Sequence, residues 1–179
     1  MKVNNLTGIF TLVVGRGATV GEKMINDHRI PLISFTGSTR MGKKIAEATA
    51  KRLARSLLEL GGNNAIIVAE DANIDLVVPA VLFGAIGTAG QRCTTTRRLI
   101  VHESIVDNLT QKLVKTYEQI RIGDPLDENK IMGPLVDQDA EDNMMKALKS
   151  VPDEGGQIIF GGKKIDQSGF YFTPCLVIV

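Results

Sequence analysis

Short β-prone runs that end in glycine and lead into helical sequence most constrain how this chain can fold. "LISFTG" is followed by Ser38, which can cap a helix, and then by Met41 and Ile45 at helical spacing. "FTLVVG" precedes "TVGEKMINDH" in the same way, with Thr19 as a candidate cap. Strands that alternate with helices favour a mainly parallel sheet, because parallel strands need a crossover that is usually helical. The predicted fold class is therefore α/β.

The remainder of the chain continues this alternation. "SLLELGG" and "NAIIV" predict two strands joined by a glycine pair, and "RRLIVH" predicts another. Residues 74–90 are apolar on all sides and predict a buried helix, with Pro79 near its first turns. Ser104 and Asp107 resemble a capping box that opens a helix. Further expected elements are a loop over 123–134, a helix up to about residue 150, and short closing strands.

Composition limits the class of protein and its partners. The 179 residues are 44% hydrophobic and 23% charged, which is ordinary for a soluble globular chain of one domain or parts of two. A net charge of +1 gives no single-sign field that would recruit nucleic acid or anionic lipid. No apolar run approaches the roughly 20 residues that cross a bilayer, and the first residues lack the apolar core of a signal peptide. We therefore expect a cytoplasmic protein whose partner is a small molecule or another protein.

The cysteines and histidines predict no metal site. Cys93 and Cys175 are the only cysteines, too few for a secreted disulfide framework, so reduced thiols are expected. His28 and His102 lie far apart in the sequence, and neither CxxC nor HExxH occurs. Both histidines occupy ordinary strand-end or helix-end contexts, which makes them poor candidates for a catalytic base.

Two glycine segments invite comparison with phosphate-binding loops. "GRGATVG" has three residues, not two, before its last glycine, so a tight turn is favoured over a dinucleotide fingerprint. In "FTGSTRMG", Gly37 follows a strand and Ser38 starts a helix, which exposes free N–H groups and the positive end of the helix dipole. Two interpretations of this segment stay open: a site for a bound phosphate and a plain helix cap.

Glu59 is an acidic residue in an otherwise apolar run. Such a carboxylate must be paired, exposed at a strand end, or pushed towards its protonated form by desolvation. The last state would suit a general base that works near neutral pH, whereas a strand-end carboxylate bonded to loop N–H groups is the structural alternative.

Cys93 presents a similar choice between structure and chemistry. Free cysteine is among the most buried residue types and is usually structural. Cys93, however, follows a glycine-rich loop and has Arg92, Arg97 and Arg98 nearby, whose charge favours a thiolate. Cys175 lies in the apolar "FTPCLVIV" and is interpreted as a core residue.

Three stretches in this order, "SFTGSTRMG", "LLELGGNNA" and "GQRC", resemble the aldehyde dehydrogenase superfamily. The segments "ELGGNNAIIV" and "GTAGQRCTTTRR" look most like the antiquitin, or α-aminoadipic semialdehyde dehydrogenase, branch of this superfamily. The resemblance implies NAD-dependent oxidation of an aldehyde to a carboxylic acid, with NADP still open and a semialdehyde such as α-aminoadipic semialdehyde as substrate.

The resemblance also implies roles for single residues. Cys93 would be the nucleophile that forms a thiohemiacetal, hydride would pass to the nicotinamide, and the backbone N–H of Cys93 would help to hold the oxyanion. Glu59 would activate the water that hydrolyses the thioester. Thr94 would line the substrate pocket. The implied cofactor-binding residues are Gly37, Ser38, Thr39, Gly42, Leu60 and Gly61.

Family members are much longer than this chain. The resemblance implies that residues 1–60 form the end of a Rossmann-type NAD-binding domain, and that residues 61–179 form the larger part of an α/β catalytic domain. The complete protein would be a homo-oligomer. For the chain alone we expect little or no turnover and a tendency to associate. A truncated, non-catalytic binding or subunit-interaction module and a cysteine acyl-transferase or esterase are the alternatives.

Overall fold

The computed structural model describes residues 8–179, which divide into two compact units. The first ends at Gly61 and the second begins at Gly62. This boundary lies one residue beyond the division expected from the sequence. The assignment of the two units as cofactor-binding and catalytic parts remains a prediction.

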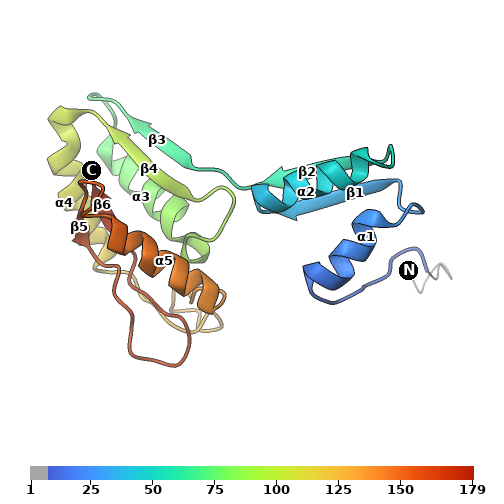
Figure 1. Cartoon of the computed structure of the whole chain (residues 1–179). Helices are drawn as coiled ribbons and strands as arrows, with labels where there is room; N and C mark the ends of the chain where they lie inside the picture. Colours follow the sequence, from blue (N-terminus) through green and yellow to red (C-terminus); the bar gives the residue numbers. More distant parts are fainter. Residues whose placement is uncertain (1–7) are drawn as a thin grey trace. The chain divides into compact units, whose positions relative to one another are not determined.

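The first unit is a parallel pair of strands that carries two helices (Figure 1). Its elements are a π-helical turn (Gly17–Gly21), α1 (Glu22–Asn26), β1 (Leu32–Gly37), α2 (Thr39–Ala50) and β2 (Arg55–Leu60). Ile25 of α1, Ile33 of β1 and Ile45 of α2 form its buried core. The predicted strand 32–37 and the helix after it are confirmed, and Ser38 caps that helix by accepting the N–H of Met41.

Two expectations for the start of this unit were wrong. Phe10–Gly15 contains no strand, and its apolar side chains, such as Leu12 and Val14, are exposed. A strand needs a hydrogen-bonded neighbour, and residues 8–179 supply none to this segment. Thr19 does not cap a helix either: it lies inside the π-helical turn, where its hydroxyl donates to the carbonyl of Arg16.

The second unit places helices around two separate strand pairs. Strands β3 (Asn64–Val68) and β4 (Thr96–Val101) are parallel, and β5 (Gln157–Phe160) and β6 (Leu176–Ile178) are antiparallel. Its helices are α3 (Ile74–Ile86), α4 (Val106–Tyr117) and α5 (Gln138–Ser150). Leu109, Leu113 and Tyr117 of α4 pack with Val81 of α3 and Val68 of β3 in the main core.

Most predicted elements of the second unit are confirmed, with two differences. Helix α3 is only half buried: Val81 and Ile86 lie in the core, whereas Leu76 and Phe83 are exposed. Its apolar composition therefore overstated its burial. Ser104 is not the expected helix cap, because His102 caps a short 3₁₀ turn (Glu103–Ile105) with its ring nitrogen, which accepts the N–H of Ser104.

Candidate functional site

The first unit brings the predicted cofactor residues together at one end of its sheet. Gly37 and Leu60 are paired in the register of β1 and β2, and Thr36 pairs with Glu59. The carboxyl ends of both parallel strands therefore meet at the first turn of α2. In open α/β sheets, ligands bind outside these carboxyl ends.

Gly42 joins this end of the sheet to helix α2. It is buried, and a Cβ at this position would lie 2.5 Å from a methyl group of Leu60. Absence of a side chain thus allows the first turn of α2 to approach the end of β2. Gly37, Ser38, Thr39, Gly42, Leu60 and Gly61 are consequently gathered in one region.

The amino end of α2 offers free donors to an anion. Ser38 accepts the Met41 N–H at 3.2 Å, and the first backbone bond of the helix runs from Gly42 N–H to Ser38 O. Within residues 8–179, the N–H groups of Thr39 and Arg40 have no acceptor. Unpaired N–H groups and the helix dipole together favour negative charge at this point.

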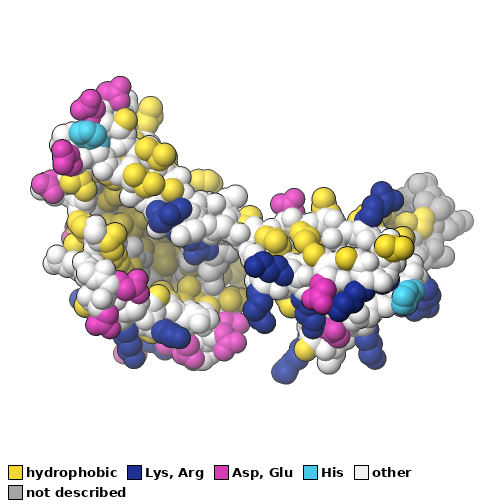
Figure 2. Space-filling model, turned by 45° about the horizontal axis from the view of Figure 1, so that its top comes forward, with side chains coloured by type: hydrophobic (Ala, Val, Ile, Leu, Met, Phe, Trp, Pro, Cys, Tyr) yellow, Lys and Arg dark blue, Asp and Glu magenta, His cyan; other side chains and the backbone are white. Residues whose placement is uncertain are grey.

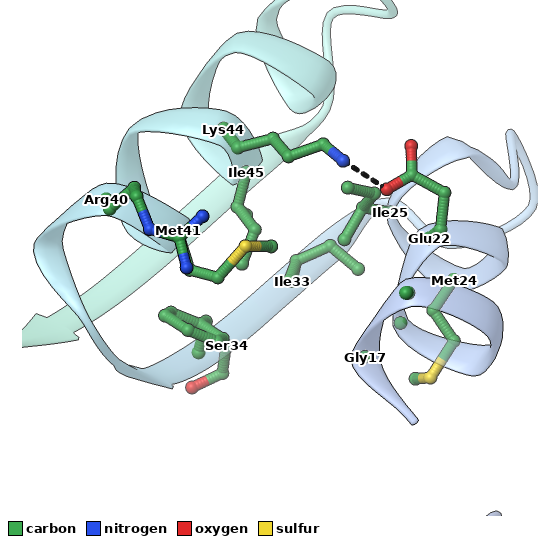
Figure 3. A pocket seen from close by; sticks show the side chains of 13 residues that line it. Gly17, Glu22, Met24, Ile25, Ile33, Ser34, Arg40, Met41, Lys44 and Ile45 are labelled. Carbon is green, nitrogen blue, oxygen red and sulfur yellow. Dashed lines mark hydrogen bonds and ion pairs between the residues drawn. The ribbon is translucent and has the colours of Figure 1, made fainter. Parts of the chain in front are cut away.

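A pocket of about 520 Å³ lies beside this helix end (Figure 3). Ile25, Ile33 and Met41 give it an apolar lining, and Gly17 and Gly21 form part of its wall. The Lys44 ammonium and the Glu22 carboxylate form an ion pair at its edge, with N and O 2.5 Å apart, and this pair lowers the pKa of Glu22. "GRGATVG" is thus a turn, as favoured, but one that lines a pocket.

Charge is unequally divided between the two units. Residues 1–61 contain ten Lys and Arg against four Asp and Glu, a net charge of +6, whereas residues 62–179 contain eleven against sixteen, a net charge of −5. The overall charge of +1 conceals this asymmetry. The unit that holds the pocket is therefore the one that attracts an anionic ligand.

Glu59 lies near the end of β2 as an exposed carboxylate. It forms no ion pair or hydrogen bond with residues 8–179. Of the three states considered for Glu59, the first unit shows a carboxylate exposed near a strand end. The hydrogen bonds to loop N–H groups that the structural alternative required are absent among residues 8–179. The Glu59 carboxylate is therefore accessible from solvent.

In the second unit, Cys93 lies in a turn between α3 and β4, and both it and Thr94 are exposed. A 3₁₀ turn (Gly87–Gly90) leads into this turn, and Thr88 and Ala89 adopt left-handed φ values of 55° and 51°. A β-branched residue in that region is strained, typically by about 1 kcal/mol or more. Surrounding contacts must hold the segment in place.

Gln91 and Arg92 supply several of these contacts. The Gln91 amide donates to the carbonyls of Thr88 and Pro134, at 3.2 and 3.3 Å, and accepts the N–H of Val136 at 2.9 Å. The Arg92 guanidinium donates to the Phe83 carbonyl at 2.6 Å and lies 4.9 Å from the centre of the Phe83 ring. Arg92 thus secures the loop against α3.

Arg98, another arginine close to Cys93 in the sequence, is held by a backbone carbonyl. Arg98 donates to the carbonyl of Asn63 at 2.8 Å.

Cys175 is half-buried rather than fully within the core, and burial raises the pKa of its thiol. His28 and His102 are exposed, and the His102 ring contacts Ser104. Among residues 8–179, no group of three His, Cys, Asp or Glu side chains could hold a metal ion.

No helix within residues 8–179 has both the length and the apolar character needed to span a membrane.

Comparison with known proteins identifies the family. The chain matches the aldehyde dehydrogenase family over residues 5–179, and it belongs to that family. It is 49% identical over 177 residues to the α-aminoadipic semialdehyde dehydrogenase of Bos taurus. The aligned residues cover 99% of this chain and 33% of that relative. Aldehyde dehydrogenase family 7 member B4 of Arabidopsis thaliana is 45% identical over 178 residues, or 99% of this chain and 35% of that protein.

Solved structures agree with this relationship. A betaine aldehyde dehydrogenase of Staphylococcus aureus, in complex with NAD+, matches this chain with a TM-score of 0.88 and 32% sequence identity. The match covers 92% of this chain and 34% of the chain of that enzyme. A lactaldehyde dehydrogenase of Escherichia coli matches 92% and 35% with the same TM-score and 31% identity. The α/β, aldehyde dehydrogenase-like fold is confirmed. The chain spans about a third of the length of these relatives.

Proposed function

We propose that this chain supplies the nucleophile, the general base and part of the cofactor site of an NAD-dependent aldehyde dehydrogenase. The family match carries this proposal, because it extends over residues 5–179 and therefore includes Cys93 and Glu59. Both side chains are exposed and therefore accessible to substrate and water. NADP stays an alternative cofactor.

In the proposed reaction, the Cys93 sulfur forms a bond to the aldehyde carbon and gives a thiohemiacetal oxyanion. The backbone N–H of Cys93 suits an oxyanion donor, because it has no acceptor within residues 8–179. NAD, when bound, accepts the hydride that this carbon releases. Glu59 then removes a proton from the water that attacks the resulting thioester, which frees the carboxylic acid and the Cys93 thiolate.

The first unit fits the chemistry of a dinucleotide. NAD carries a negatively charged pyrophosphate and a flat, largely apolar base. The free N–H groups of Thr39 and Arg40 and the net charge of +6 suit the pyrophosphate, and the apolar pocket beside Met41 suits the base. We propose Gly37, Ser38, Thr39, Gly42, Leu60 and Gly61 as the surrounding residues.

The proposed substrate is a semialdehyde such as α-aminoadipic semialdehyde. Its support is the 49% identity to an enzyme of that name. Thr94, next to the nucleophile and exposed, is proposed to line the substrate pocket. A homo-oligomeric complete protein is proposed on family grounds alone.

NADH formation from an aldehyde and hydrolysis of a p-nitrophenyl ester, measured for this chain and for Cys93→Ala, test the function. Ester cleavage and NADH formation that both require Cys93 would support the proposal, and NADH formation is expected to be slow for the chain alone. Ester cleavage without NADH formation would favour an acyl-transferase or esterase. Absence of both in the folded chain would favour a non-catalytic binding or subunit-interaction module.

A further inference from the structure

The two peptide groups that flank Cys93 are held by different partners. The Arg92 carbonyl, which precedes Cys93, accepts the N–H of Thr95 at 3.1 Å within the turn. Because C=O and N–H point in opposite directions in a trans peptide, this bond directs the Cys93 N–H away from the turn. The carbonyl of Cys93 itself accepts no backbone N–H from residues 8–179.

Asn64 provides the missing partner. Its side-chain amide donates to the carbonyl of Cys93 at 2.7 Å and to that of Thr95 at 3.0 Å. Asn64 is the first residue of β3 and pairs with Thr96 at the start of β4. The strand pairing therefore carries the amide to the end of the turn that holds the thiol.

A register shift sits at the same place. Asn64 pairs with Thr96 but Ala65 pairs with Arg98, so Arg97 is the extra residue of a bulge. Bulges re-aim side chains and are frequent beside active sites. Here the irregularity lies directly beside the residue that holds the Cys93 carbonyl.

We propose that Asn64 is a positioning residue for Cys93, an inference that rests on the proposed function. By fixing the Cys93 carbonyl, Asn64 restrains the backbone torsion that sets where the thiol and the free N–H of the same residue point. The thiol at the carbonyl carbon and the N–H at the carbonyl oxygen then act on one carbonyl group in a fixed mutual geometry. Asn64 contacts the backbone of the nucleophile and not the reacting atoms.

Two reactions of the same thiol separate positioning from reactivity. When p-nitrophenyl acetate acylates Cys93, the S–C bond forms through a tetrahedral oxyanion, the C–O bond breaks and p-nitrophenolate leaves. Alkylation by iodoacetamide displaces iodide at carbon and forms no oxyanion. Loss of Asn64 should therefore slow acylation about tenfold or more and change alkylation by less than about twofold.

The variants are made in a Cys175→Ala background, so that Cys93 is the only thiol. Asn64→Ala removes the amide, and Asn64→Leu keeps about its size without a donor or a charge, so the two should behave alike. Asn63→Ala is the matched control: the Asn63 side chain makes no hydrogen bond with residues 8–179, and its backbone carbonyl, which accepts from Arg98, is retained. Circular dichroism verifies that each variant is folded.

Each result has a defined meaning. Slow acylation with normal alkylation in both Asn64 variants, and neither change in Asn63→Ala, supports the positioning role. Unchanged acylation, or an equal loss of both reactions, overturns it and leaves Cys93 as the nucleophile. Acylation of the parent chain no faster than that of N-acetylcysteine overturns the nucleophile assignment, and the positioning role with it.

Discussion

At the scale of single residues, the two cysteines differ through their surroundings alone. Cys93 is exposed in a turn, whereas Cys175 is half-buried just before β6, where burial raises the pKa of its thiol. The sequence put Cys93 after a glycine-rich loop and left its burial open, whereas it placed Cys175 in an apolar segment and overstated the burial of that thiol.

We expect iodoacetamide to label Cys93 at least about tenfold faster than Cys175 near neutral pH, since only a thiolate that reagents can reach reacts. Mass spectrometry of the digested chain measures both rates in one sample. In denaturant the two rates should converge. Equal rates in the folded chain would contradict the difference in environment.

Tyr117 gives a stability test at alkaline pH. Burial raises the pKa of this phenol from 10.0 to about 12, with a smaller contribution from Cys175. The folded-state pKa lies above the unfolded one, so the stabilisation is complete below about pH 10 and is lost as pH rises towards 12. The expected loss is about 2–3 kcal/mol.

Urea unfolding between pH 9 and 12 measures this loss as the difference between the parent chain and Tyr117→Phe. The parent chain should lose more free energy of unfolding than the variant, because phenylalanine does not titrate. Parallel curves for the two proteins would show that Tyr117 does not carry the effect.

At the scale of elements, the contact of α2 with β2 depends on the size of one residue. Gly42 is buried where a Cβ would lie 2.5 Å from a methyl group of Leu60, so an added side chain requires Leu60 or the helix to shift. The sequence indicated Gly42 through its family pattern, but only the packing shows what it touches.

Gly42→Ala should lower the free energy of unfolding of the first unit by about 1 kcal/mol. Overpacking typically costs about 1–3 kcal/mol, and the better helix propensity of alanine offsets up to about 1 kcal/mol of it. Urea unfolding provides the measurement. Gly61→Ala, where a Cβ meets nothing within 4 Å, should change stability by less than about 0.5 kcal/mol.

The sign of the effect identifies its cause. In a Leu60→Ala background the clash is absent, so Gly42→Ala should become neutral or stabilising through helix propensity. An equal penalty in both backgrounds would mean that Leu60 is not the neighbour that resists the added methyl group.

At the scale of the whole molecule, the two units have separate cores. Ile25, Ile33 and Ile45 form one, and the cluster around Leu109 forms the other, with no residue in common. Both units also expose apolar side chains, visible as yellow atoms in Figure 2. Stability and association are therefore properties to measure unit by unit.

Ile45→Ala should weaken the first unit by about 2–5 kcal/mol, since Ile45 is only 2% exposed. Hydrogen exchange should accelerate in β1, α2 and β2, with little change in α3 and α4. Leu109→Ala, at a position 1% exposed, is the reciprocal variant and should show the opposite pattern. Uniform acceleration in either variant would mean that the units unfold together.

The chain should associate as its concentration rises, through exposed apolar positions on its strands. Ile67 and Ile100 pair across β3 and β4 and are 76% and 53% exposed. Replacement of both by threonine keeps the strand propensity and removes apolar surface. Light scattering should then report a lower apparent mass at a given concentration. An unchanged mass would exclude this pair as a main contact.

Local patterns in the sequence determined much of this protein. The run "LISFTG" followed by Ser38 specified β1, the cap and α2, because each depends on residues a few positions apart. The same reasoning failed for Phe10–Gly15, since composition alone cannot supply a neighbouring strand. For α3, uniform apolarity could not reveal which side chains remain exposed.

Tertiary structure decided how the residues around Cys93 and Gly42 are held. Asn64 and Cys93 are 29 positions apart, and their hydrogen bond exists only because β3 pairs with β4. The left-handed turn at Thr88 and Ala89 opposes local preference and persists in a segment held by the contacts of Gln91 and Arg92. The sequence by itself determined the fold class through local pattern, and it offered Cys93 and Glu59 as candidates through residue type, with their roles implied by the family resemblance. Packing between segments distant in the sequence decided which contacts hold these groups in place, and no local preference encodes such contacts.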